Sequence, residues 1–155
     1  MLVPVGIALG SNLGNREAEL DAGVAFLRLI AYDREVLEGP RIETEPDNCP
    51  PGSPSFLNTV AEITIESMEF PPLNLLGALE DFEIERGRSP IRERNSPRPL
   101  DLDIIYYGHQ VIREPFLVVP HPRAHVRRFV LEPLSHLRPD LVLPGQTKTV
   151  SELLG

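Results

Sequence analysis

The chain has 155 residues, of which 41% are hydrophobic and 25% are charged, and its net charge is −8. This length and this apolar content predict one folded domain spanning residues 1–155. The acidic excess argues against a general nucleic-acid binder, because such proteins need a basic surface. No apolar run is long enough for a membrane span, and the first residues lack the pattern of a signal peptide. Cys49 is the single cysteine, so no internal disulfide can form, and we expect a cytoplasmic protein.

The basic residues are unevenly distributed along the chain. Residues 1–85 carry 4 basic and 16 acidic side chains, whereas residues 86–155 carry 11 basic and 7 acidic ones. Fourteen of the fifteen basic residues are arginines, whose planar guanidinium suits paired contacts with phosphate oxygens. Five of these arginines cluster at Arg86, Arg88, Arg92, Arg94 and Arg98. On charge alone, this cluster is either a phosphate-binding segment or a solvated loop.

The first half of the chain predicts a strand, a helix and two further strands. Alternating apolar residues predict a strand over residues 3–9, followed by a tight turn at residues 10–15. Asn15 can cap the next helix, whose apolar positions are Leu20, Val24 and Leu27. A second strand is expected within residues 35–44, interrupted by Gly39 and Pro40. Residues 45–55 form a proline-rich loop, and residues 56–65 form a third strand.

The second half predicts a helix and one more core strand. Pro71 and Pro72 can open the helix, which should end near Gly87. A polar loop at residues 88–99 leads into a strand at 100–106, and a short helix is expected around 126–131. The order of elements predicts an α+β fold with a ferredoxin-like βαββαβ core. Its antiparallel sheet should carry the helices on one face, and a short C-terminal extension should follow.

Asp101 and Asp103 carry the strongest chemical signal. On a strand, alternate side chains share a face, so the two carboxylates point the same way while Leu100, Leu102 and Ile104 point into the core. Two like charges roughly 7 Å apart repel each other, and a divalent cation such as Mg²⁺ removes that repulsion. The alternative is a pair of solvent-facing aspartates on an edge strand. Because the arginine-rich segment runs directly into this strand, we favour a site where a metal ion and phosphate meet.

Three weaker signals remain open on the residues alone. The turn at residues 10–14 could approach a phosphate, but it lacks the lysine and hydroxyl of a P-loop, which favours a plain turn. His121 and His125 are four residues apart, as in a metal pair on a helix; without further ligands, a phosphate contact or a capping role is favoured over zinc. Asn58 and Phe56 share a strand face and offer an amide and a ring to a heterocycle, although such a pair is often ordinary surface.

Two other functional classes would use some of the same features. A metal-dependent nuclease also needs paired aspartates, but it should carry a basic track for its substrate. A ligand-sensing ferredoxin-like module would explain the fold, but it would not require Asp101 and Asp103 beside Arg98.

Five segments together resemble the 6-hydroxymethyl-7,8-dihydropterin pyrophosphokinase family of the folate pathway. They are Gly10-Ser11-Asn12-Leu13-Gly14, Phe56-Leu57-Asn58, Pro97-Arg98-Pro99-Leu100-Asp101-Leu102-Asp103, Pro120-His121-Pro122-Arg123 and Arg127-Arg128-Phe129-Val130-Leu131-Glu132-Pro133-Leu134. The match covers nearly the whole chain in the family's order and spacing. The resemblance implies transfer of the β,γ-diphosphate of ATP to the hydroxymethyl group of the pterin, with release of AMP.

The resemblance also implies a role for individual residues. Asp101 and Asp103 would bind two Mg²⁺ ions, and Arg88 and Arg98 would hold phosphate oxygens during the reaction. The expected contacts with ATP are Arg88, Arg98, Ile104, His121 and Arg127, and those with the pterin are Thr44, Phe56, Asn58 and Phe129. Loops 45–55 and 86–97 would close over the reactants, and the enzyme would act as a monomer without membrane or nucleic-acid partners. Asn95, Pro122 and Glu45 depart from residues common in the family.

Overall fold

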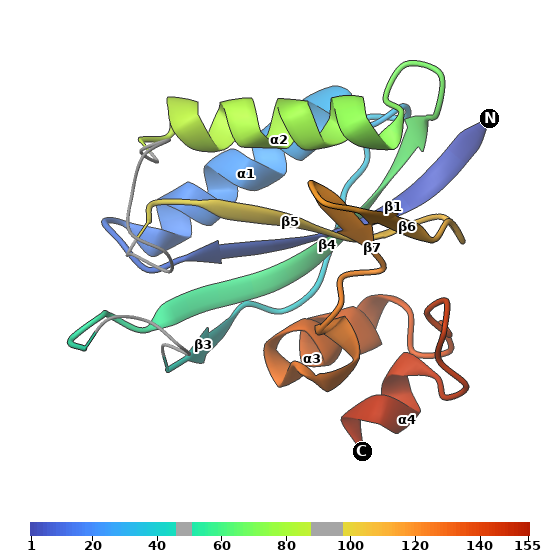
Figure 1. Cartoon of the computed structure of the whole chain (residues 1–155). Helices are drawn as coiled ribbons and strands as arrows, with labels where there is room; N and C mark the ends of the chain where they lie inside the picture. The colour runs from blue at the N-terminus through green and yellow to red at the C-terminus, as the bar shows by residue number, and fades with distance from the viewer. Residues whose placement is uncertain (46–50, 88–97) are drawn as a thin grey trace.

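A five-stranded antiparallel sheet forms the centre of the computed structural model, which describes residues 1–45, 51–87 and 98–155. Its long strands are β1 (Leu2–Ser11), β4 (Phe56–Glu66) and β5 (Asp101–Tyr107). Two short strands, β2 (Leu37–Glu38) and β3 (Ile42–Thr44), both pair with β4. The strand order β2–β4–β1–β5 and the antiparallel pairing confirm the predicted ferredoxin-like core (Figure 1).

Helices α1 (Arg16–Ile30) and α2 (Pro72–Glu85) cover one face of this sheet (Figure 1). The side chain of Asn15 accepts a hydrogen bond from the Ala18 amide and so caps α1, as predicted. Pro72 lies at the start of α2, where its missing N–H has no helical partner to lose. Gly87 follows α2 with φ +108°, a conformation that favours glycine at a helix end. The predicted start of α1 and the predicted start and end of α2 are therefore confirmed.

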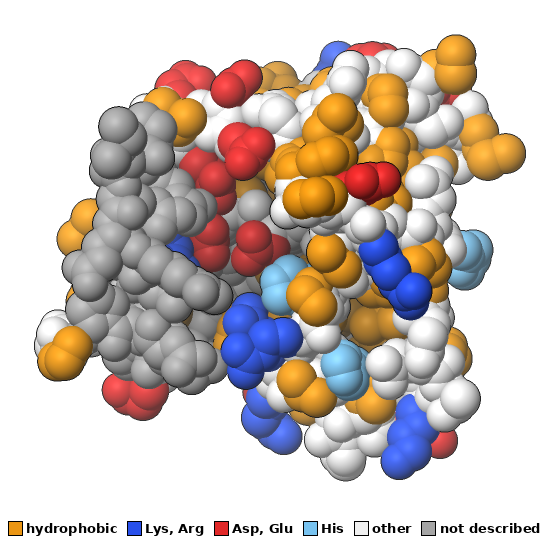
Figure 2. Space-filling model, viewed as in Figure 1, with side chains coloured by type: hydrophobic (Ala, Val, Ile, Leu, Met, Phe, Trp, Pro, Cys, Tyr) orange, Lys and Arg blue, Asp and Glu red, His pale blue; other side chains and the backbone are white. Residues whose placement is uncertain are grey.

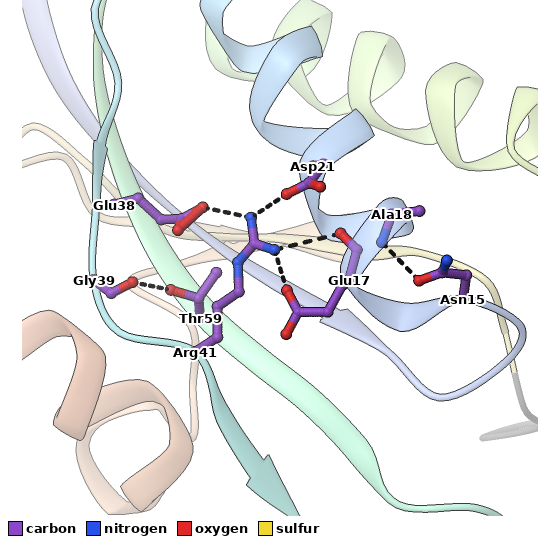
Figure 3. A network of polar contacts seen from close by, with 8 residues as sticks. All are labelled: Asn15, Glu17, Ala18, Asp21, Glu38, Gly39, Arg41 and Thr59. Carbon is purple, nitrogen blue, oxygen red and sulfur yellow. Dashed lines mark hydrogen bonds and ion pairs between the residues drawn. The ribbon is translucent and has the colours of Figure 1, made fainter.

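The interrupted second strand remains fixed to its neighbours. The amide of Gly39 donates to the Val60 carbonyl over 2.9 Å, and the Thr59 hydroxyl donates to the Gly39 carbonyl over 2.9 Å. Between β2 and β3, Arg41 reaches α1 and forms ion pairs with Glu17, Asp21 and Glu38 (Figure 3). The segment that leads to Thr44 is thus tied to the first turns of α1.

The C-terminal elements differ from the expectation of helices on one face. After the hairpin β6 (Ile112–Glu114) and β7 (Leu117–Val119), the 3₁₀ turn η1 (Ala124–Val126) leads into α3 (Arg128–Leu137), and α4 (Val150–Leu154) follows. Helices α3 and α4 lie across the sheet from α1 and α2 (Figure 1). The short helix expected at 126–131 instead spans residues 128–137. It extends past Pro133 because Val130, Leu131 and Leu134 lie on one buried face of the helix.

The sheet therefore separates two hydrophobic cores. Leu102, Ile104 and Tyr107 of β5 belong to the core beneath α1 and α2, whereas Ile105 and Tyr106 belong to the core beneath α3. The β1–β5 register shifts between Gly6 and Ile7, which places two consecutive β5 residues on the same side. Before this shift the alternation is regular, so Asp101 and Asp103 lie on the α3 side of the sheet.

Tyr106 links the sheet to the end of α3. A Cβ at residue 6 would lie only 2.3 Å from the Tyr106 ring, which is too close for any side chain, so residue 6 must be glycine. The Tyr106 hydroxyl donates to the buried Glu62 carboxylate, and Arg138 Nε lies 3.6 Å from the same oxygen. Burial and the Glu62 carboxylate raise the pKa of Tyr106, so its hydroxyl keeps the proton it donates. Within the described ranges, none of the helices combines the length and apolar character of a membrane span.

Candidate active site

One cross-strand row brings the two ends of the candidate site together. Gly10 on β1 lies opposite Asn58 on β4 and opposite Asp101 on β5. In the adjacent row with the same orientation, Ala8 lies opposite Val60 and Asp103. Because directly opposed residues share a face, Asn58 and both aspartates lie on the α3 side. Two strand spacings separate the backbones of Asn58 and Asp101 by about 10 Å.

Gly10 leaves the middle of this row open. A Cβ at residue 10 would lie 2.8 Å from Asn58 Oδ1 and 3.5 Å from the Phe56 ring. The carbonyl oxygen of the Asn58 amide therefore extends over the glycine backbone. Because Gly10 has no side chain, none lies between the amide and the carboxylates in this row, and we call this part of the sheet face the trough.

The two carboxylates lie beside Arg98 at the β5 end of the row. Asp101 and Asp103 are half-buried and share a face, as the sequence predicted. Arg98 Nη2 lies 3.5 Å from Asp101 Oδ2, with side-chain exposures of 12% and 19%. The Arg98 guanidinium carbon also lies 5.1 Å from the centroid of the Phe56 ring. Arg98 thus contacts both Asp101 and Phe56, the aromatic residue near Asn58.

The donor set of this site fits Mg²⁺ rather than a fully protein-bound metal. In residues 1–45, 51–87 and 98–155, no group of three or more His, Cys, Asp or Glu side chains is placed to hold a metal ion. Mg²⁺ is commonly bound by only one or two protein carboxylates, while substrate phosphates and water supply its remaining ligands. Zinc would instead require additional nitrogen or sulfur ligands.

Three of the residues expected to bind the pterin, Thr44, Phe56 and Asn58, adjoin one another across β3 and β4. Asn58 Nδ2 donates to Thr44 Oγ1 over 2.7 Å, and Thr44 is the register partner of Phe56. Phe129, at the start of α3, packs against the core that contains Val60. The structure therefore assembles an amide, a hydroxyl and an aromatic ring at this end of the site.

His121 lies near Asp101 and Arg127 and is uncharged. Its amide donates to the Ile105 carbonyl over 2.9 Å, and its Nδ1 accepts from the Arg123 amide over 3.2 Å. Burial, and next the positive charge of Arg127, lower the pKa of His121 to about 4, against the opposing effect of Asp101. Because Nδ1 accepts a hydrogen bond, the single proton of the neutral ring is on Nε2.

The two histidines do not form a helical pair. His125 belongs to η1, whereas His121 precedes it, so the helical metal pair, which the sequence disfavoured, is not formed. Both line a pocket of about 320 Å³ between the β6–β7 hairpin and residues 143–146. On the face shown in Figure 2, acidic side chains gather beside a histidine and a group of basic side chains.

Arg127 and Phe129 form the side of the site that α3 contributes. The Arg127 guanidinium carbon lies 5.3 Å from the Phe129 ring centroid. Arg127 Nε is buried, and no acceptor for it is present in the part of the chain that the structure describes. A buried donor in this position can accommodate an anionic oxygen of a ligand.

Of the residues expected to contact ATP, Arg88 lies outside the described residues, and Ile104 directs its side chain away from the site. The departure Asn95 also lies outside the described residues, as do residues 46–50 and 88–97 of the two loops expected to close. The Ile104 side chain is buried in the core beneath α1 and α2. Leu102, two residues earlier, donates its amide to Glu83, away from β1. Hydrogen-bonding groups of alternate residues point to the same side of a strand, so the Ile104 N–H and carbonyl also point away from β1.

Sequence reasoning missed two buried polar residues, Asn12 and Glu83. Asn12 Oδ1 accepts from the Arg98 amide over 2.8 Å, and Glu83 Oε2 accepts from the Leu102 amide over 2.6 Å. The sequence places Asn12 in the turn at residues 10–14 and in the first segment of the family resemblance, but predicts no partner for its side chain. Glu83 follows Leu75 and Leu79 at helical spacing, and a carboxylate on that apolar stripe was the available signal.

Comparison with known proteins identifies the family. Residues 6–139 match the model of the family described as 7,8-dihydro-6-hydroxymethylpterin-pyrophosphokinase. The chain belongs to this family. The resemblance seen in the five sequence segments is therefore confirmed, and so is the assignment to the transferases of folate biosynthesis as a pyrophosphokinase.

Individual relatives agree with this assignment. The chain is 39% identical over 145 residues to the 2-amino-4-hydroxy-6-hydroxymethyldihydropteridine pyrophosphokinase of Pseudomonas aeruginosa, covering 93% of this chain and 86% of the relative. It is 35% identical over 153 residues to the enzyme of the same name from Haemophilus influenzae, covering 99% and 92%. A crystal structure of a Plasmodium falciparum HPPK-DHPS triple mutant with pteroate matches with a TM-score of 0.64 and 13% identity, covering 99% of this chain and 43% of that chain. At this identity the structural match supports the fold alone.

Proposed function

We propose that the chain transfers the diphosphate of ATP to 6-hydroxymethyl-7,8-dihydropterin in the trough between Asn58 and Asp101. The hydroxymethyl oxygen attacks the β-phosphorus and loses its proton, the bond between this phosphorus and the α,β-bridging oxygen breaks, and AMP leaves. The observation that carries the proposal is the row Asn58–Gly10–Asp101, which sets a ring-binding amide about 10 Å from a pair of carboxylates.

Asn58 recognises the pterin in this proposal. Its Nδ2 already donates to Thr44, which fixes the amide plane and leaves Oδ1 over Gly10 to accept from a ring N–H of the ligand. Phe56 and Phe129 supply apolar surface for a flat heterocycle. Thr44 therefore acts by orienting the amide and by bordering the ring.

Arg98, Arg127 and His121 bind the triphosphate. Arg98 is held beside Asp101, and Arg127 carries a buried Nε–H that a phosphate oxygen would satisfy. The neutral His121 donates through Nε2, and the outward main chain of Ile104 is available to the nucleotide. Arg88 joins this set by the family resemblance. Positive groups that face the transferred phosphates stabilise the charge that develops on them.

Asp101 and Asp103 hold Mg²⁺, and by the family resemblance two ions are expected. When bound, these ions neutralise charge on the attacking and leaving oxygens. We further propose a monomeric enzyme, and the composition supports a cytoplasmic one.

The metal requirement provides the first test. The protein is incubated with ATP and the pterin, with Mg²⁺ present or removed by chelation, and AMP release is followed. We expect AMP only when both Mg²⁺ and the pterin are present. AMP release at the same rate in chelator, or without the pterin, would contradict the proposal.

A further inference from the structure

Asn12 binds both main-chain polar groups of Arg98. Its side-chain Oδ1 accepts from the Arg98 main-chain N–H over 2.8 Å, and its main-chain N–H donates to the Arg98 carbonyl over 3.3 Å. The Asn12 side chain is almost fully buried, with 1% exposure for the residue. A buried amide is retained where its hydrogen bonds are made, so Asn12 anchors the main chain at residue 98.

The sequence around Arg98 explains why a side chain is needed there. The regular β1–β5 register ends at the pair Gly10 and Asp101, and its continuation would place Asn12 opposite Pro99. Proline has no N–H and cannot continue the ladder. The Asn12 carboxamide extends past it and accepts from the next available donor, the amide of Arg98.

The side-chain carboxamide of Asn12 also contacts the segment before Phe56. Asn12 Nδ2 donates to the Pro54 carbonyl over 3.5 Å, a long and therefore weak hydrogen bond. Phe56, two residues later, lies under the Arg98 guanidinium at 5.1 Å. One buried side chain thus contacts the backbone on both sides of the Arg98–Phe56 contact.

We propose that Asn12 is a positioning residue, which holds the Arg98 guanidinium beside Asp101 for the transition state; this inference rests on the proposed phosphate role of Arg98. Asn12 acts on the reaction through the Arg98 main chain, to which it is hydrogen-bonded. The hydrogen bond from the Arg98 amide to Asn12 Oδ1 is the main contact that positions Arg98, and the weaker hydrogen bond from Nδ2 to Pro54 contributes less to this positioning.

The test compares Asn12→Leu, which removes the acceptor, with Asn12→Asp, which keeps an oxygen for the Arg98 amide. Asn15→Ala is the matched control: it removes a cap from the same turn but contacts neither Arg98 nor Pro54. Positioning predicts that kcat falls about tenfold to 100-fold in Asn12→Leu, because small misplacements of catalytic groups have effects of this size. KM values should stay within about threefold, and Asn12→Asp should recover most of kcat.

Amide exchange gives a readout that is independent of turnover. In NMR spectra, the Arg98 amide should exchange at least about tenfold faster in Asn12→Leu and stay protected in Asn12→Asp, since protection follows the hydrogen bond. The Leu102 amide, held by Glu83, serves as the internal control and should not change. If Asn12→Leu does not fold, Asn12→Ser carries the same expectations, because its hydroxyl is one bond too short to reach the amide.

The outcomes separate this inference from the proposed function. Loss of Arg98 protection with unchanged kcat, or equal kcat losses in Asn12→Leu and Asn15→Ala, would overturn positioning and leave the enzyme assignment intact. A wild-type protein that releases no AMP would overturn the proposed function, and the positioning role with it.

Discussion

The amide of Asn58 donates a hydrogen bond to the hydroxyl of Thr44 over 2.7 Å. This bond joins β4 to β3 and fixes which end of the amide faces Gly10. Since a Cβ on Gly10 would lie 2.8 Å from Asn58 Oδ1, the acceptor oxygen is the end that borders the trough. The orientation of one side chain therefore determines which hydrogen bond the site can offer to a pterin.

Asn58→Ala should weaken pterin binding about tenfold or more, because an unpaired buried polar group costs about 1–3 kcal/mol. ATP affinity should change much less, since the phosphate residues lie across the row at Asp101. Titration calorimetry with each ligand gives both affinities. Thr44→Val, which removes only the orienting hydroxyl, should produce a smaller loss for the pterin. Parallel losses for both ligands would mean that Asn58 supports the fold instead.

Gly10→Ala should reduce pterin affinity without unfolding the protein. The added methyl would meet Asn58 Oδ1 at 2.8 Å and the Phe56 ring at 3.5 Å, so the amide must shift away from its ligand position. Gly77→Ala is the matched control, because no atom lies within 4 Å of its added Cβ inside α2. That control should raise stability by about 0.5–1 kcal/mol and leave binding unchanged. Equal pterin affinity in the two variants would show that the trough is not the binding site.

Asp101→Asn and Asp103→Asn should separate metal binding from stability. Repulsion between the two carboxylates at roughly 7 Å is about 0.6 kcal/mol in water and about 2.4 kcal/mol at an effective dielectric of 20. Asp101→Asn also weakens the contact with Arg98, so we expect metal-free melting temperatures close to wild type. Turnover and Mg²⁺-dependent ATP binding should fall by orders of magnitude.

Asp140→Asn, at an exposed position beyond α3, is the control for these variants. It should keep wild-type turnover. A well-folded Asp103→Asn protein with near-normal turnover would eliminate the metal site.

His121 predicts a pH dependence of stability with a definite sign. Its folded pKa is about 4, below the ordinary value of 6.5. Between these values the unfolded chain binds a proton that the folded protein does not, so the free energy of unfolding decreases as pH falls from about 6.5 to about 4. Thermal melts from pH 7.5 to 4.5 should therefore show a smaller acid loss for His121→Gln than for wild type. His109→Gln, at an exposed turn, is the control. Identical acid losses in His121→Gln and wild type would contradict the lowered pKa.

Local patterns predicted most of the fold. Alternation in β1, β4 and β5, the Asn15 cap and Gly87 at the end of α2 are each decided within a few residues. The placement of α3 is not local, because it depends on a second core between Val60, Ile105 and Leu134, which come from distant segments. Pro133 by itself favours a helix end, but it lies inside α3, where burial outweighs its missing donor.

The site was predictable where residues share a strand face. Asp101 and Asp103 follow from the pleat alone, whereas the row from Asn58 through Gly10 to Asp101 requires the strand register. Asn12 and Glu83 remained hidden because each satisfies the backbone of a segment far along the chain. A turn motif and a helix stripe contain no information about such partners.

The fate of the ATP phosphates tests the central claim most directly. ATP labelled at the α-phosphate or at the γ-phosphate is incubated with the protein, Mg²⁺ and 6-hydroxymethyl-7,8-dihydropterin, and the products are separated. Diphosphate transfer predicts that the α-label appears in AMP and that the γ-label appears in a pterin carrying two phosphates. The γ-label in a pterin monophosphate, with ADP as the first nucleotide product, would contradict the account.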